Sequence, residues 1–343
     1  RRAQLNFPIS DLRFGRSFIK ALGLIKQSAA ETNLELNLLD KKIAESIIIS
    51  AQEVIDGDHD DSFVVDIFQT GSGTSTNMNV NEVISNLAIS KMGGEIGSRN
   101  PVHPNDHVNK GQSSNDVIPT AIHIAAAISI KDDLVPSMKI LKKSLQKKSD
   151  EFWNIVKTGR THLQDATPIR LGQEFKGYYG QIENSIKKVN SGLDELSVLA
   201  LGGTAVGTGI GMNPEFCGSV ISKISDKTGI NFSETENHFQ SQSTIDGIVY
   251  ASGCVRSFAV SLMKIANDIR WLGSGPRAGI GELNLPEVQP GSSIMPGKVN
   301  PVIAESVTMI CAQVMGNDQT VSIAGQSGNF ELNVMMPIAA HNL

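Results

Sequence analysis

Apolar residues recur at helical spacing along most of the chain. In one segment, Ile43, Ile47 and Ala51 fall on a single helical face. The segment begins near Asp40, a residue type that often caps a helix N-terminus, and stops before Gly57. The pattern predicts an amphipathic helix between these two residues.

A second helix is predicted from Asn213 to Gly229. Pro214 would occupy its first position, where a missing backbone N–H costs nothing, and Val220 and Ile221 would face inward. A glycine just after the last periodic residue is a typical helix end.

Three longer stretches, at 117–156, 173–199 and 243–272, exceed the usual length of a globular helix and carry apolar residues on more than one side. Such helices belong inside a bundle. One run resembles a strand, Phe63 to Phe68, and it is too isolated to build a sheet. The sequence therefore predicts an all-α fold.

Glycine-rich, polar stretches separate the predicted helices and are longer than simple connectors. Long loops on a rigid scaffold commonly carry function, so we expect functional residues in them. These predicted loops are 69–82, 97–116, 158–170, 200–213 and 284–300.

Composition narrows the function classes. Lys and Arg number 30 and Asp and Glu 35, for a net charge of -5, and no basic run is present to neutralise a row of phosphates. No nucleic-acid partner is expected. No stretch approaches the roughly 20 uninterrupted apolar residues of a membrane span, so no membrane association is expected either.

The three cysteines, Cys217, Cys254 and Cys311, lie far apart without CxxC spacing. Packed free thiols in a reducing compartment are expected. The sequence begins at Arg1 without a methionine and stops at Leu343. We therefore expect that both ends lack residues of the full product, and a targeting segment stays open.

The string GSSIMPGKVNPVIAES at 291–306 carries the strongest chemical signal. Asn300 followed by Pro301 is typical of a helix N-cap, so a loop is expected to lead directly into a helix. Free backbone N–H groups at that terminus attract an anion, and Lys298 adds a full positive charge. The string by itself predicts an anion site, although serines in such loops are more often solvated turn residues.

Three further strings are rich in hydrogen-bonding side chains. GRTHLQDATP at 159–168 places Thr161 beside His162, and a single histidine is more often structural than catalytic. TGSGTSTNMNVNE at 70–82 and GQSSNDVIPT at 111–120 are crowded with Ser, Thr and Asn, which mostly cap helices.

His103 and His107 have the i, i+4 spacing of a zinc pair. Pro104 between them argues against the helix that such a pair needs, and no third ligand follows at a telling distance. No metal site is therefore expected.

Taken in order, the four strings resemble the signature regions of class II fumarases in the fumarase/aspartase superfamily, and the resemblance covers essentially the whole chain. Ser114 and Thr167 stand where aspartases typically have threonine and valine. Val299 stands where argininosuccinate and adenylosuccinate lyases carry a second basic residue. Within the superfamily the chain is therefore most similar to fumarases.

The resemblance implies residue roles for the reversible hydration of fumarate to L-malate through an aci-carboxylate carbanion. Ser292 would be the base that removes a proton from malate. His162 would act through a bound water, and Glu305 would orient and charge the imidazole of His162. The implied substrate-binding residues are Ser72, Thr74, Ser113, Ser114, Asn115, Thr161, Ser293, Lys298 and Asn300.

The resemblance also implies a second anion site at His103, Asn105 and Asp106. Asn100 stands where relatives have a basic residue, with Arg99 one step earlier, so this site departs from the family pattern.

The resemblance implies no metal and no organic cofactor. It implies a homotetramer with active sites shared between subunits, and a fumarase/aspartase-like fold in which long central helices form a bundle. The expected division is an N-terminal helical domain at 1–112 and a central domain at 113–343, without the family's small C-terminal domain. The cytoplasm is the expected location, with the mitochondrion as the alternative.

Two rival functions stay open. One is aspartate ammonia-lyase, which incubation with L-aspartate would reveal. The other is a catalytically inert structural protein on the same fold. Such proteins often lose a catalytic residue, whereas His162, Ser292, Lys298 and Glu305 are all present.

Overall fold

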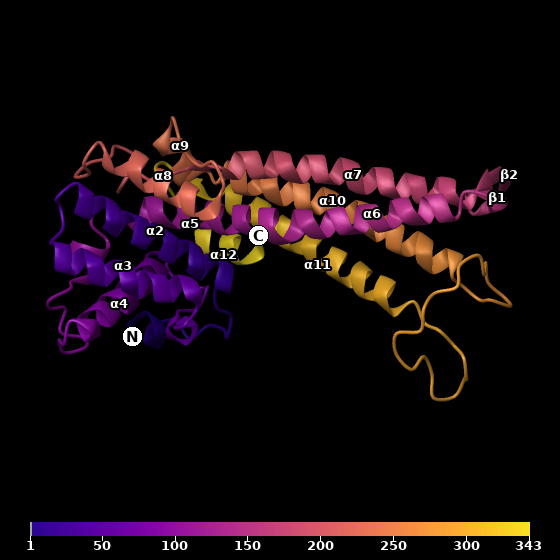
Figure 1. Ribbon diagram of the computed structural model, residues 1–343, viewed down its shortest axis with the longest axis horizontal. Helices are drawn as coiled ribbons and strands as arrows, with labels where there is room; N and C mark the ends of the chain where they lie inside the picture. The colour runs from indigo at the N-terminus through magenta and orange to yellow at the C-terminus, as the bar shows by residue number, and fades with distance from the viewer. Residues whose placement is uncertain (1) are drawn as a thin grey trace. The chain divides into compact units, whose positions relative to one another are not determined.

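The chain is mostly helical in the computed structural model, which describes residues 2–343 (Figure 1). Helices dominate and the strands of the described residues form only two-stranded pairs, so the all-α prediction is confirmed. The chain divides into two compact units. Unit 1 comprises Arg1–Asp133, Gly192–Ser252 and Gln319–Leu343, and unit 2 comprises Leu134–Ser191 and Gly253–Asp318. The domains expected at 1–112 and 113–343 are a different partition, which stays a prediction.

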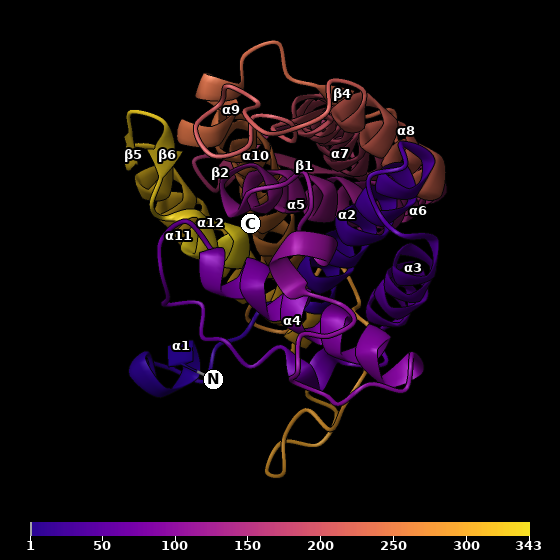
Figure 2. The same ribbon diagram turned by 90° about the vertical axis from the view of Figure 1, so that its left-hand side faces the viewer.

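Unit 1 is built around α2, whose residues are mostly buried and which packs against α3, α5 and α8 (Figure 2). Small residues allow this close packing, since a side chain at Gly23 would meet Ile55 on α3. The helices of this unit are α1 (Arg2–Asn6), α2 (Arg16–Glu35), α3 (Lys41–Asp56), η1 (Asp60–Ser62), α4 (Thr74–Lys91), η2 (Pro104–Val108), α5 (Ser114–Ser129), α8 (Phe216–Thr228), α9 (His238–Ser243) and α12 (Met336–Asn342). Its strands are β3 (Val198–Leu199) paired with β4 (Ser233–Glu234), and β5 (Gly328–Asn329) paired with β6 (Leu332–Asn333).

Unit 2 contains long helices and one hairpin. Tyr178 on α7 donates a hydrogen bond to Asp268 on α10 at 3.0 Å, and Lys142 on α6 forms an ion pair with Glu183 on α7 at 2.9 Å. These contacts hold the helices side by side. The elements are α6 (Val135–Glu151), β1 (Val156–Thr161), β2 (Gln164–Arg170), α7 (Leu171–Leu196), α10 (Asp246–Leu272) and α11 (Val302–Gly325), of which the last three extend into unit 1 at one end. The π-helical turn η3 (Ile130–Leu134) joins α5 to α6.

The predicted helix after Asp40 is confirmed as α3. The Asp40 carboxylate accepts hydrogen bonds from the backbone N–H groups of Lys42 and Ile43, and Gly57 ends the helix in the left-handed conformation. The helix expected from Asn213 is confirmed at its end, Gly229, but it begins at Phe216 rather than at Pro214. The Asn213 side chain instead accepts from the Glu215 N–H, which forms a turn before the helix.

Three segments expected to be loops are partly regular, and one of them, 97–116, contains η2 and the first residues of α5. The stretch 69–82 becomes helical at Thr74, because Gly73 provides the left-handed turn that starts α4. The stretch 158–170 belongs to the antiparallel hairpin β1–β2. The isolated run Phe63 to Phe68 contains no strand.

No α-helix spans His103 to His107, in keeping with the prediction from Pro104, and Pro104–Val108 instead forms a short π-helical turn. Proline is tolerated there because it occupies the first position, where its missing N–H has no intrahelical partner. The His103 N–H donates to Nδ1 of His107 at 2.9 Å, so this ring nitrogen of His107 caps the turn.

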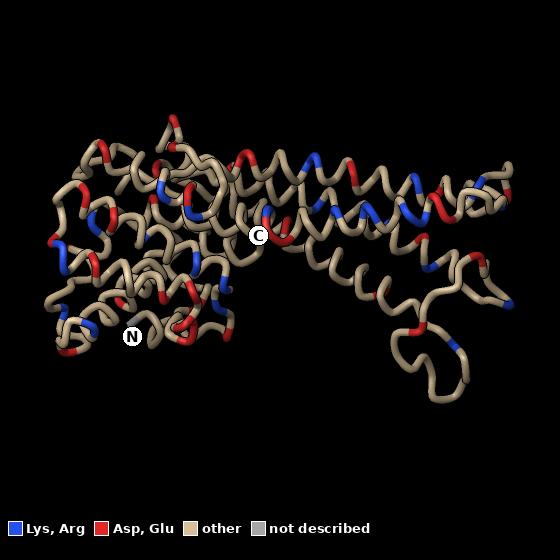
Figure 3. Tube along the Cα trace, viewed as in Figure 1, with Lys and Arg blue, Asp and Glu red and all other residues tan. Residues whose placement is uncertain are grey.

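Helix α10 is long and apolar enough to cross a membrane by length and composition alone. Core helices of helical bundles meet the same criterion, and α10 carries Arg256 and Lys264 inside its span. Charges are interspersed in sign along both units (Figure 3). The expectation of packed free thiols is confirmed, since Cys217, Cys254 and Cys311 are all buried and unpaired with each other.

Candidate functional site

A polar pocket of about 430 Å³ opens in unit 1. It lies where the N-terminal ends of α4 and α5 meet the turn after η2 and the loop at 200–213. Helix N-termini leave backbone N–H groups free, which suits an anionic ligand. The polar side chains that line the pocket belong to Thr74, Asn77, Asn109, Gln112, Ser113, Ser114 and Thr204.

Three of the predicted substrate-binding hydroxyls are joined in one chain beside this pocket. The Thr74 hydroxyl lies 2.8 Å from that of Ser72 and 2.8 Å from that of Ser114. The residues come from two strings 40 positions apart, so the fold brings them together. Asn115, the next residue, uses its Nδ2 to donate to the carbonyl of Ala205 at 2.8 Å. Asn115 therefore holds the 200–213 loop against the helix start.

Ser113 and Asp116 begin α5 with a reciprocal capping box. The fully buried Asp116 carboxylate also accepts from the N–H groups of Gly202 and Thr204, at 3.2 and 3.0 Å. Burial raises the pKa of Asp116 to about 6, while these backbone donors lower it in part. One carboxylate thus fixes both the helix start and the loop that form the pocket.

Several pocket residues were missed by the sequence analysis, namely Asn77, Asn109, Gln112 and Thr204. For Asn77 a signal existed. It lies one helical turn after Thr74, so both side chains share a face of α4. Asn109 and Thr204 are placed by turn geometry that no short-range pattern reveals.

In unit 2, Thr161 and His162 lie at the tip of the β1–β2 hairpin. His162 and Leu163 form the turn, with φ angles of 56° and 61°. Both residues are exposed. Two left-handed residues in succession match the twist of a two-residue hairpin turn. Leucine is unusual there, which explains why a loop was expected instead.

Ion pairs fix the base of this hairpin. Lys157 lies 2.8 Å from a Glu174 oxygen and 2.5 Å from a Glu282 oxygen, and Arg160 donates to Glu282 at 2.7 Å. The neighbouring cations keep the pKa of Glu282 below its usual value, although burial opposes them. The histidine is thus carried on a hairpin whose base is held and whose tip is exposed.

The 284–300 loop is irregular, as predicted, and it carries Ser292, Ser293 and Lys298. The Ser292 Oγ accepts hydrogen bonds from the N–H groups of Ile294 and Met295, at 3.2 and 3.1 Å. A side chain at Gly291 would collide with the Lys298 carbonyl, since a Cβ there would lie 1.7 Å from that oxygen. Glycine is therefore required where the two ends of the loop approach each other.

The helix that follows this loop begins at Val302, one residue later than the expected cap at Asn300 implies. The Asn300 Nδ2 donates to the Gly291 carbonyl at 2.9 Å, so the side chain closes the loop. Glu305 lies in the first turn of α11, where a carboxylate favours the positive end of the helix dipole.

At the second anion site implied by the resemblance, His103 and Asp106 interact with each other. The His103 Nδ1 lies 3.2 Å from the Asp106 carboxylate and accepts from the Asp106 N–H. The neighbouring Asn105 is exposed.

The predicted residues thus form two groups. Unit 1 holds the hydroxyl and amide donors Ser72, Thr74, Ser113, Ser114 and Asn115, together with the second anion site. Unit 2 holds Thr161, His162, Ser292, Ser293, Lys298, Asn300 and Glu305.

Known proteins resemble this chain along nearly all of its length. The lyase family model matches residues 1–316. Fumarate hydratase class II of Caulobacter vibrioides is 54% identical over 337 residues, which cover 98% of this chain and 73% of that protein. The corresponding protein of Nitrosomonas europaea is 52% identical, with 99% and 74% covered.

A solved structure agrees with these relatives. The class II fumarase of Schistosoma mansoni superposes with a TM-score of 0.97 at 41% identity, covering 99% of this chain and 75% of that one. The fumarase/aspartase-like fold is therefore confirmed. Two relatives with the same name each share more than half of their aligned residues with this chain, which indicates the same chemistry. The chain belongs to the class II fumarate hydratase family of lyases.

Proposed function

We propose that this protein adds water to fumarate to form L-malate, and runs the reverse reaction, at a site that includes the unit 1 pocket. The observation that carries this function is the 54% identity with a fumarate hydratase over 98% of the chain. The pocket supports it, because neutral hydroxyls and amides can orient a small dianion without excess charge.

Ser292 is proposed as the base that removes the proton from the methylene carbon of malate. Serine is a poor base at neutral pH, so its alkoxide needs stabilisation. The two N–H groups that donate to its Oγ favour the ionised form, and Lys298 belongs to the same loop.

Removal of this proton by Ser292 leaves negative charge on the adjacent carboxyl group, which becomes an aci-carboxylate. Backbone donors, Lys298 and the start of α11 would stabilise this charge most strongly as it develops. His162 would deliver a proton to the departing hydroxyl through a water, and Glu305 would orient and charge the imidazole. The remaining predicted donors, Ser72, Thr74, Ser113, Ser114, Asn115, Thr161, Ser293 and Asn300, would bind the two carboxylates.

Further proposals concern the assembly and its setting. We propose a homotetramer in which different subunits complete each active site, because the predicted residues fall into two groups in separate units. We also propose that the chemistry needs no metal or organic cofactor. The three cysteines are buried and form no disulfide with one another, which supports a cytoplasmic location.

The test is direct. Purified protein is mixed with L-malate, and the absorbance of fumarate is followed as it forms. Parallel incubation with L-aspartate measures ammonia release. Rapid malate dehydration with negligible ammonia supports the proposal, whereas ammonia release at a comparable rate would assign the protein to the aspartate lyases. Absence of both activities in folded protein would favour an inert relative.

A further inference from the structure

Lys26 on α2 is a fully buried lysine directly behind the unit 1 pocket. Its Nζ donates to Asn77 Oδ1 and Asn109 Oδ1 at 2.8 Å each, and to Gln112 Oε1 at 2.9 Å. A protonated lysine has three donors and no acceptor, so these three neutral amides satisfy it completely. The arrangement fits the charged form of the side chain.

No carboxylate neutralises this ammonium at close range. Among the ion pairs of residues 2–343 none includes Lys26. The field of Asp116 reaches it from α5, but the Asp116 carboxylate is hydrogen-bonded to backbone N–H groups. Burial lowers the pKa of Lys26 to about 7, and Asp116 raises it in part. An unpaired buried charge is costly, so its presence calls for a compensating partner.

The pocket is the place for that partner. The three amides that contact Lys26 all line it, so only one layer of neutral side chains separates the ammonium from a bound molecule. The other polar side chains of the lining are also uncharged. A dianion in the pocket would supply the missing negative charge, and its field would favour the protonated form of Lys26.

We infer that Lys26 is a positioning residue that acts through Asn77, Asn109 and Gln112, and that its buried positive charge holds a small dicarboxylate in the unit 1 pocket. The identity of the dicarboxylate as fumarate or malate rests on the proposed function. Lys26 is not in the pocket lining but lies behind its amides, so we expect its charge to act on substrate and transition state alike.

Two variants remove the charge in different ways. Lys26→Met deletes the ammonium. Asn109→Asp keeps size and shape but places a carboxylate 2.8 Å from Nζ, which neutralises the pair, at the loss of the Asn109 hydrogen bond to the Gln112 carbonyl. Both variants should raise the KM for fumarate about tenfold while kcat changes less than about threefold, the pattern of lost uniform binding.

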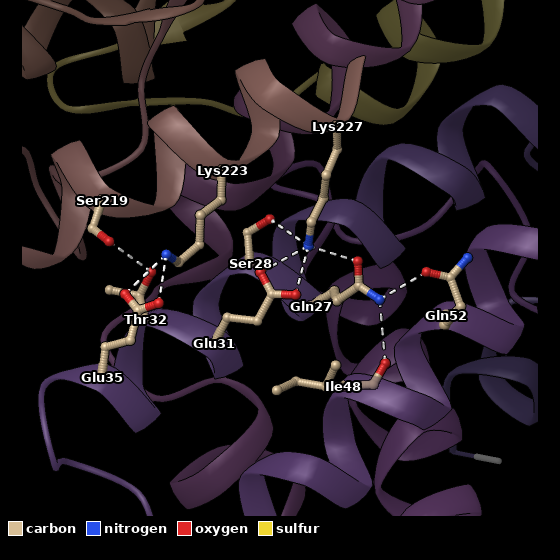
Figure 4. A network of polar contacts seen from close by, with 10 residues as sticks. All are labelled: Gln27, Ser28, Glu31, Thr32, Glu35, Ile48, Gln52, Ser219, Lys223 and Lys227. Atoms are coloured by element: carbon tan, nitrogen blue, oxygen red, sulfur yellow. Dashed lines mark hydrogen bonds and ion pairs between the residues drawn. The ribbon is translucent and has the colours of Figure 1, made fainter. Parts of the chain in front are cut away.

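Gln27→Glu is the matched control. Gln27 is the next residue of α2, and its Oε1 lies 2.7 Å from Nζ of Lys227 on α8, away from the pocket lining (Figure 4). The same change of amide to carboxylate beside a lysine should leave KM within about twofold of the parent value. An equal rise of KM in this control would overturn the inference, because the effect would then be a general one on packing.

Binding of succinate, an unreactive four-carbon dicarboxylate, is measured by calorimetry on the same proteins. The dissociation constant should rise about tenfold in Lys26→Met and Asn109→Asp and stay unchanged in Gln27→Glu. If Lys26→Met fails to fold, the near-isosteric Asn109→Asp decides. Folded Asn109→Asp with unchanged KM and unchanged succinate affinity would overturn the role of Lys26.

The two proposals fail separately. A parent enzyme that turns over fumarate while the charge variants keep its KM contradicts the inference about Lys26 alone. A parent protein without hydratase activity contradicts the proposed function alone, provided that succinate binds it and loses affinity in the charge variants.

Discussion

The Ser292 Oγ accepts a hydrogen bond from the Met295 N–H at 3.1 Å, within the same glycine-bounded loop. A hydroxyl that accepts from backbone donors is biased toward its ionised form, because the donors stabilise negative charge on oxygen. Ser292 accepts from two backbone N–H groups, whereas the exposed Ser98 accepts from one.

Ser292→Ala should lower kcat at least about a hundredfold, the usual contribution of a positioned base, with little change in melting temperature. The serine is only partly buried, so its removal leaves no enclosed cavity. Steady-state kinetics and thermal melting measure the two effects. Ser144→Ala, at an exposed position on α6, is the control that should keep full activity. Near-normal turnover of Ser292→Ala would remove the serine as the base.

His162→Asn should also lower kcat about a hundredfold. Asparagine is chosen because it tolerates the left-handed φ of 56° found at this position, so the hairpin turn should keep its shape. Leu163→Asn, at the adjacent left-handed position, is the control for the turn itself. A similar loss in both variants would point to the hairpin conformation rather than to the imidazole.

Acid should destabilise the protein through His123. Burial lowers the pKa of His123 to about 4, from the 6.5 of an unperturbed histidine. Between these values the unfolded chain binds a proton that the folded chain does not. The contribution of His123 to stability is therefore fully present above pH 6.5 and is lost as the pH falls toward 4.

Melting temperatures at a series of pH values across this range measure the loss. His123→Gln should show a smaller drop than the parent protein, whereas His341→Gln, at an exposed position, should follow the parent. A parallel drop in parent and His123→Gln would show that His123 does not control the acid limb.

Lys26 should make stability depend on pH in a more alkaline range than His123 does. Its pKa is about 7 in the folded chain, whereas a solvated lysine side chain has a pKa of 10.5. Between these values the unfolded state binds the extra proton, so stability should rise with pH by up to about 1.4 kcal/mol per pH unit. Below the lower value both states are protonated and the contribution is constant.

Denaturation of the parent protein and Lys26→Met at pH values of about 7, 8 and 9 provides the comparison. The stability of the parent relative to the variant should increase over this range. A difference that stays constant or decreases would contradict the low pKa of the buried lysine.

The sequence was sufficient for the helical class and for the caps of α3, because periodicity and capping are local. The resemblance to class II fumarases named Thr74, Ser113 and Ser114, which line the unit 1 pocket, but Thr204, another hydroxyl of the same lining, was missed. The sequence did not single out Lys26, because a lone lysine in an apolar helix is expected at the solvent-exposed edge of the helix. Its burial becomes evident only from its three partners, which come from distant segments. The hairpin at 156–170 was missed because its turn uses Leu163, a residue that propensity disfavours there.

The start of α11 shows a further limit. Asn300 and Pro301 match a capping pattern, yet the Asn300 amide donates across nine residues to Gly291. A local pattern cannot foresee this long-range bond, which orients the Asn300 amide toward the start of the loop.

The close approach of Gly291 to Lys298 holds the two ends of the 291–298 loop next to each other. The backbone of Gly291 lies against the Lys298 carbonyl, so the two ends of the loop cannot slide past each other. We therefore expect that substrate exchange involves movement of the segment from Ser292 to Gly297, while Lys298 keeps its place. Lengthening the segment from Ser292 to Gly297 should loosen Ser292 alone, whereas any side chain added at Gly291 should displace Ser292 and Lys298 together.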